Sequence, residues 1–163
     1  MKDFTLSTYK KLLDTLLEKG YVFFTFEEYC SGKASGKFVV IRHDIDNKPA
    51  NTLKIAEIES VLSLKATYYF RTNARVFDTD IIKKIASSGH EIGYHYRDLT
   101  QAGGNCKEAI DLFRQNLSNL RFFVPISTIA MDGNPWSKYD NRDLWKKYDY
   151  RNFGIIGEPY FDF

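Results

Sequence analysis

The stretch VVIRHDIDNKP, residues 39–49, places four reactive side chains directly after an apolar run: Arg42, His43, Asp44 and Asp46. Two carboxylates at this spacing repel one another and raise each other's pKa unless a cation lies close to both. Aspartate and histidine are ligands of zinc and, less selectively, of cobalt, nickel and iron. The pattern therefore predicts a divalent-metal site in which one carboxylate binds the ion and the other acts as a base toward water.

The later predicted strands also end in polar side chains. These are Arg71 after KATYYFR, His95, Arg97 and Asp98 at and after the end of HEIGYH, and Asp132 near the end of ISTIAMDG. Parallel strands place their carboxyl ends at one edge of the sheet, where the strand ends are rigid and the loops beyond them can vary. We therefore expect the histidine and the aspartates to belong to one shared site assembled from several strand ends.

Alternating strands and helices must position these side chains. The predicted strands cover residues 21–26, 37–43, 65–71, 90–95, 126–133 and 153–160. The predicted helices cover residues 6–20, 26–32, 49–64, 78–89, 105–120 and 141–148. This order is typical of βα units with right-handed crossovers and a mostly parallel sheet.

Composition limits the class of protein. The chain has 163 residues, 44% apolar and 16% aromatic, which predicts one folded domain over residues 1–163. The net charge of +2 comes without a basic cluster, so we expect no nucleic-acid partner. The N-terminal segment lacks a long apolar run, which predicts no signal peptide, no membrane span and a cytoplasmic location.

Several of these residues also have a purely structural interpretation. Asp46 is as well explained by capping of the helix that starts at Pro49 as by metal binding. His90 opens a predicted strand, and we expect it to be a structural polar residue. Tyr68 and Tyr69 lie within an apolar strand, and we expect them in the core.

The motifs VVIRHDID, KATYYFRTN and GHEIGYHYRDL, taken in this order, resemble the polysaccharide deacetylase family, the NodB-like carbohydrate esterases. The resemblance covers residues 38–99 and is nearest to a bacterial branch with an RHDxD motif. It implies an α/β fold, namely a distorted, incomplete (β/α) barrel of the glycoside hydrolase and deacetylase type with mostly parallel strands. It also implies a metal-dependent hydrolase that removes N-acetyl groups from a polysaccharide or an amino sugar.

The resemblance implies a role for each motif residue. Asp44 would be the catalytic base, and Asp46 and His95 would bind a divalent metal, with zinc expected first. The family's second histidine ligand corresponds to Leu99, which cannot bind metal. Asp98 and Asp132 are the two candidates to replace it, and the strand-end position of Asp132 favours that residue.

Other motif residues are expected to contact the substrate or the metal ligands: His43, Arg42, Arg71, Tyr94 and Asp98. His43 is also a candidate ligand if its loop turns it inward. The family's late histidine, which assists as a general acid, has no counterpart, because no histidine follows residue 95.

The chain is shorter than the roughly 200 residues or more of closed βα barrels. A predicted final strand without a following helix suggests an open half-barrel that lacks a C-terminal part. A homodimer or a second polypeptide would cover its open edge. The alternative function is therefore a weakly active or inactive relative that binds carbohydrate or assists assembly.

Overall fold

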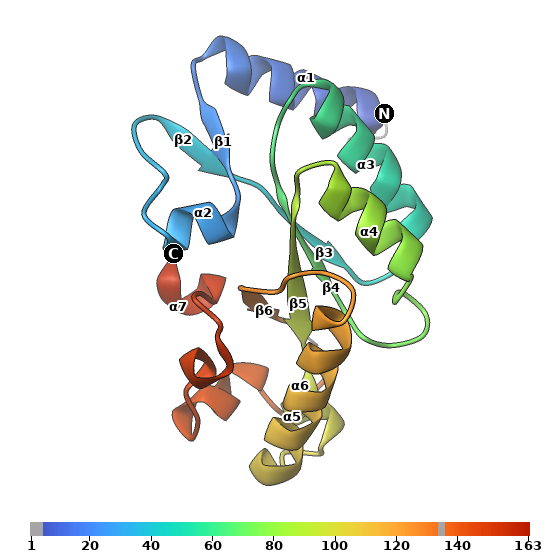
Figure 1. The fold of residues 1–163 in the computed structure, drawn as a ribbon, viewed down its shortest axis with the longest axis vertical. Helices are drawn as coiled ribbons and strands as arrows, with labels where there is room; N and C mark the ends of the chain where they lie inside the picture. Colours follow the sequence, from blue (N-terminus) through green and yellow to red (C-terminus); the bar gives the residue numbers. More distant parts are fainter. Residues whose placement is uncertain (1–4, 134–135) are drawn as a thin grey trace.

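The computed structural model describes residues 5–133 and 136–163. Six short strands pair in parallel throughout, in the orders β1–β2 and β3–β4–β5–β6. The strands are β1 (Val22–Phe24), β2 (Phe38–Val40), β3 (Arg42–Ile45), β4 (Thr67–Phe70), β5 (Glu91–Tyr96) and β6 (Ile129–Met131). The parallel strands curl into a half-barrel (Figure 1). The predicted mixed α/β class with parallel strands is thus confirmed.

Helices connect the strands and pack around the half-barrel (Figure 1). They are α1 (Leu6–Glu18), α2 (Phe26–Cys30), α3 (Pro49–Val61), α4 (Thr79–Ser87), α5 (Asp98–Gln101), α6 (Cys106–Arg121) and α7 (Pro159–Asp162), with 3₁₀ helices at Asn141–Lys146 and Tyr150–Phe153. Side-chain caps define several starts: Thr25 forms a capping box with Glu28, and Asn105 accepts two backbone N–H groups of α6. None of the described helices is long and apolar enough to cross a membrane.

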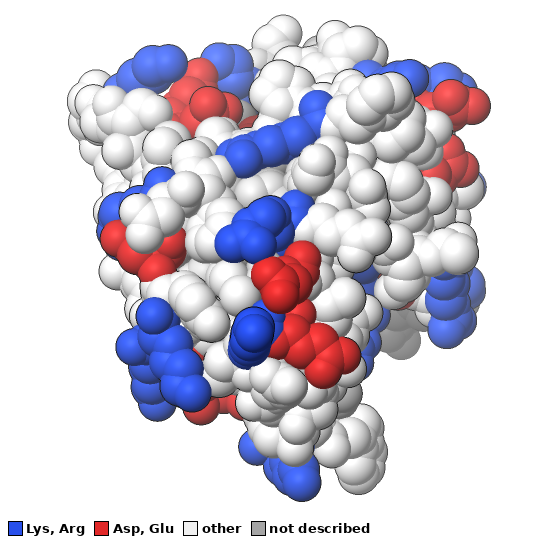
Figure 2. Space-filling view, turned by 60° about the horizontal axis from the view of Figure 1, so that its bottom comes forward, with Lys and Arg blue, Asp and Glu red and all other residues white. Residues whose placement is uncertain are grey.

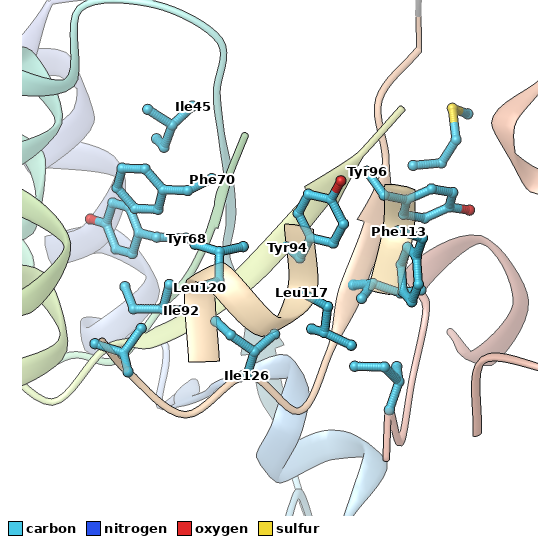
Figure 3. Close-up of a cluster of buried hydrophobic side chains, with 14 of the residues drawn as sticks. Ile45, Tyr68, Phe70, Ile92, Tyr94, Tyr96, Phe113, Leu117, Leu120 and Ile126 are labelled. Carbon is cyan, nitrogen blue, oxygen red and sulfur yellow. The ribbon is translucent and has the colours of Figure 1, made fainter. Parts of the chain in front are cut away.

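The convex face of the sheet carries the main core. Alternate strand residues point toward it, because successive side chains of a strand face opposite sides. The members that Figure 3 labels are Ile45, Tyr68, Phe70, Ile92, Tyr94, Tyr96, Phe113, Leu117, Leu120 and Ile126. Helix α6 presses Phe113 against this face, with its ring centroid 5.5 Å from that of Tyr94.

The concave face is filled by apolar side chains toward the amino ends of its strands and carries polar side chains at their carboxyl ends. Phe26 of α2 packs on Tyr69 and Ala130, and the ring of Tyr69 lies directly over Gly93. A Cβ atom at position 93 would overlap that ring, so the glycine of the GHEIG motif is required by packing. Two positions further along each strand, Arg71, His95 and Asp132 project from the same face at the carboxyl end of the sheet.

Three predicted elements differ from the structure, and one helix was not predicted. The strand predicted over 37–43 is two strands that change partner at Ile41, with β2 beside β1 and β3 beside β4. Helix α5 was not predicted, and the helix predicted over 141–148 is a 3₁₀ helix. The final strand over 153–160 is wrong. Gly154 turns the chain with φ 69°, Pro159 opens α7, and one bridge between Thr128 and Gly157 remains.

A polar cluster lies on the convex side of the sheet, around the buried carboxylate of Glu59 in α3. His43 Nε2 lies 2.7 Å from Glu59 Oε1, Tyr68 donates to Oε2 at 2.5 Å, and Tyr9 of α1 also donates to this carboxylate. Burial alone would raise the pKa of Glu59, but the hydrogen bonds from His43, Tyr68 and Tyr9 hold it below its ordinary value. This cluster ties α1 and α3 to the sheet.

Replacing Glu59 with glutamine is expected to lower the free energy of unfolding at pH 7 by about 1–3 kcal/mol, since buried donors lose a charged acceptor. A carboxylate with a depressed folded-state pKa stabilises the protein above its unfolded pKa, and this stabilisation is lost as the pH falls. The difference between wild type and variant should therefore shrink below about pH 4.5. Chemical denaturation at pH 7 and pH 4 measures both effects.

Glu57→Gln is the matched control, because Glu57 lies exposed on the same helix. Equal stability of the two variants at pH 7 would contradict the role assigned to Glu59.

Candidate metal site

Asp46, His95 and Asp132 converge on the concave side of the half-barrel, at the carboxyl ends of β3, β5 and β6. One potential ligand atom from each residue lies within 4.8 Å of the other two. His95 Nε2 is 3.6 Å from Asp46 Oδ1 and 4.0 Å from Asp132 Oδ1. His95 and Asp132 are buried, whereas the side chain of Asp46 is 54% exposed and leaves the site open to solvent.

The imidazole of His95 is held in the tautomer that a metal requires. Its Nδ1 lies 3.0 Å from the carbonyl oxygen of Ala130. Because a carbonyl only accepts, Nδ1 carries a proton, and Nε2, which faces the carboxylates, is the nitrogen available to a metal. A second hydrogen bond of this kind orients nearly all metal-binding histidines.

Asp132 contains a buried oxygen, Oδ2, that forms an ion pair with the guanidinium of Arg71. Its Oδ2 accepts no aligned hydrogen bond from the described residues, although Arg71 Nε lies 2.7 Å away. A buried carboxylate oxygen without a hydrogen bond is unfavourable. The donor set of one imidazole nitrogen and two carboxylates, this oxygen included, fits a divalent cation.

Asp46 does not cap helix α3. The N-cap is Lys48 in the left-handed conformation, with φ 48° and no side-chain capping bond. The carboxylate of Asp46 turns instead to Arg71, whose Nη2 lies 2.7 Å from Oδ1. The structure therefore favours the interpretation of Asp46 as a site residue over the capping interpretation.

Arg71 bridges two of the three candidate ligands. Besides Asp46, its Nη2 donates to Asp132 Oδ1 at 2.8 Å. The guanidinium thus already balances part of the negative charge of both carboxylates. A divalent ion held by the three residues would share these carboxylates with Arg71.

Asp44 borders the triad without belonging to it. Its Oδ2 lies 3.9 Å from His95 Nε2, and its side chain is 34% exposed. Arg42 donates a hydrogen bond to each oxygen of Asp44, from Nε to Oδ1 at 2.7 Å and from Nη2 to Oδ2 at 2.8 Å. This bidentate pair fixes the plane of a carboxylate that remains accessible beside the candidate ligands.

Three residues expected near the site lie on the opposite face of the sheet. His43 points to Glu59, and Tyr94 donates to both oxygens of Asp98 at 2.9 Å. Burial raises the pKa of Asp98 to about 6, and Asn116 also donates to it. The alternation of side chains along β3 and β5 removes His43 and Tyr94 from the candidate site. Asp98 opens α5 and is held by Tyr94 and Asn116, which leaves Asp132 beside His95.

The sequence did not single out Tyr160, which contacts Arg42, the partner of Asp44. Tyr160 of α7 lies between two guanidinium groups, each 5.2 Å from its ring centroid, those of Arg42 and Arg142. The final segment was predicted to be a strand, so no pattern linked Tyr160 to the motifs.

Figure 2 looks toward the end of the molecule where the strands finish, and acidic and basic side chains lie together in the middle of this face.

Asp132 also lines a pocket of about 490 Å³ with Gly133, Ser137, Lys138 and Tyr139. A larger pocket of about 910 Å³ lies away from the triad, between α6 and the two 3₁₀ helices. The space that adjoins the candidate ligands is therefore the smaller one of these two pockets.

Comparison of the chain with protein-family models, with curated proteins and with solved structures finds no match.

Proposed function

We propose that this protein is a metal-dependent hydrolase that removes N-acetyl groups from an amino sugar or polysaccharide, as the polysaccharide deacetylases do. The observation that carries the proposal is the convergence of Asp46, His95 and Asp132 beside an accessible Asp44. These four side chains come from three strand ends that are far apart in the sequence.

Asp46, His95 and Asp132 would hold the ion, for which zinc is the first candidate and cobalt, nickel and iron are alternatives. A divalent ion there supplies Lewis acidity for attack of water on an amide carbonyl. His95 contributes the single nitrogen ligand, and Ala130 fixes its orientation through Nδ1. Asp132 contributes a buried carboxylate, one oxygen of which receives no aligned hydrogen bond from the part of the chain that the structure describes.

Asp44 acts as the base. Its carboxylate accepts a proton from the attacking water while Arg42 holds its orientation. The water oxygen bonds to the acetyl carbon, and the carbon–nitrogen bond breaks. The proton passes from Asp44 to the leaving nitrogen, so the products are a free amine and acetic acid, which loses its proton to water and becomes acetate.

A second candidate function is carbohydrate binding without catalysis. It is favoured by Arg71, which already lies within 2.8 Å of oxygens of both Asp46 and Asp132 and supplies a cation from the chain itself.

Acetate release from N-acetylglucosamine oligomers distinguishes the two functions. The full chain is loaded with zinc, and the same protein treated with a chelator serves as the reference. The proposed hydrolase releases acetate only when zinc is present. Oligosaccharide binding that does not depend on zinc, without acetate release, would select the binding protein.

A further inference from the structure

Arg97 has one ion-pair partner among the described residues, the carboxylate of Asp132. Arg97 follows β5 directly, and its Nη1 lies 3.7 Å from Asp132 Oδ2, which is too far for a hydrogen bond. Its Nε is buried without a hydrogen-bond partner among residues 5–133 and 136–163. The side chain is 27% exposed, so the charged group is partly withdrawn from water while its end remains accessible.

Other arginines of this protein have closer partners, at 3.1 Å or less. Arg42 makes two hydrogen bonds to Asp44, and Arg71 pairs with Asp46 and Asp132. Arg121, far from the site, donates to the backbone carbonyls of Ile126, Phe153 and Gly154. A structural role of the Arg121 type is therefore absent for Arg97 in the described part of the chain.

The other acidic side chains near the site, Asp140 and Glu158, do not pair with Arg97 but with other groups. Asp140 pairs with Arg142, and Glu158 accepts the backbone N–H groups of Met131 and Tyr160. The three carboxylates of Asp44, Asp46 and Asp132 face three guanidinium groups, those of Arg42, Arg71 and Arg97. A divalent ion bound by Asp132 would compete with Arg97 for the oxygens of this carboxylate, so metal binding would not give Arg97 a closer partner.

A partly buried guanidinium with unused donors is unfavourable unless a ligand satisfies it. Its planar fork matches the oxygens of a carboxylate or a phosphate. We propose that Arg97 binds an anionic group of the substrate, which is then an N-acetylated amino sugar bearing a carboxylate or a phosphate. This inference rests on the proposed function and names the substrate class of the same site.

The pocket beside Asp132 offers room for the rest of such a substrate. It measures about 490 Å³, and Lys138 in its wall adds a second positive charge. The Nζ atom of Lys138 lies 5.1 Å from the ring centroid of Tyr139, and no carboxylate pairs with it among the described residues. Both cations lie on the Asp132 side of the triad, which places the anionic group of the substrate there.

Isothermal titration of the full chain, with and without zinc, tests the inference. The ligands are N-acetylglucosamine 6-phosphate, N-acetylmuramic acid and the neutral N-acetylglucosamine. At least one anionic ligand is expected to bind about 10-fold or more tightly than the neutral sugar, as expected for a hydrogen bond to a charged group. The two anionic ligands show whether phosphate or carboxylate is preferred.

Arg97→Gln is expected to remove this preference and to leave the affinity for the neutral sugar unchanged. Arg97→Lys keeps the charge without the fork and should retain part of the preference, which also guards against a folding defect in the glutamine variant. Arg75→Gln, at an exposed arginine in the loop after β4, is the control and should bind like wild type.

Equal affinity of wild type for all three sugars, or an equal loss for all three in Arg97→Gln, would overturn the inference. Acetate release measured in parallel separates it from the proposed function. Anion binding that depends on Arg97 without acetate release would refute the hydrolase and leave the anion site intact. Acetate release from neutral and anionic sugars at the same rate would do the reverse.

Discussion

Replacing His95 with alanine is expected to abolish stable zinc binding. The imidazole is the only nitrogen ligand of the triad, and Ala130 orients its free Nε2 toward the two carboxylates. Without it, the pair of Asp46 and Asp132 would be left to Arg71. Loss of partners that only orient a ligand weakens metal binding about 10–100-fold, so loss of the ligand itself should exceed about 100-fold.

Zinc content after dialysis and the dissociation constant from isothermal titration measure this effect. Asp140→Asn is the matched control, because Asp140 lies near the site, pairs with Arg142 and is not part of the triad. Asparagine can still cap the 3₁₀ helix that Asp140 begins, so folding should be preserved. Wild-type zinc affinity in the His95 variant would refute the proposed site.

Replacing Asp44 with asparagine is expected to reduce acetate release by a factor of about 100–10,000, the usual contribution of a general base. Asparagine has the shape of aspartate and can still accept one hydrogen bond from Arg42, but it cannot take a proton from water. Because Asp44 lies outside the triad, zinc content should stay at the wild-type level.

The comparison with Asp46→Asn makes the assignment specific. That variant should lose activity together with zinc, whereas Asp44→Asn should lose activity alone. Undiminished acetate release in Asp44→Asn would show that another group is the base. Loss of zinc in Asp44→Asn would instead make Asp44 a ligand.

The strand-end argument predicted much of the candidate site from sequence. Asp46, His95 and Asp132 meet because parallel strands end at one edge of a sheet. The period of two along a strand also determines the face, and it explains why Asp44 borders the site while the adjacent His43 does not. Applied fully to the sequence, the same rule would have placed Tyr94 on the other side.

The remaining features depend on contacts between distant segments. Nothing in the pattern of α3 shows that Glu59 is buried, because its partners His43, Tyr68 and Tyr9 come from other elements. The bridge that Arg71 makes across two strand ends is equally invisible in sequence. The strand predicted for the final segment does not form, because Gly154 turns the chain and Pro159 opens α7.

A crystal of the full chain loaded with zinc, measured at the zinc absorption edge, tests the central claim most directly. The account predicts an anomalous peak between the three side chains, about 2.0–2.2 Å from His95 Nε2 and from oxygens of Asp46 and Asp132. At saturating zinc, a triad without a peak, with Arg71 still spanning the two carboxylates, would contradict it.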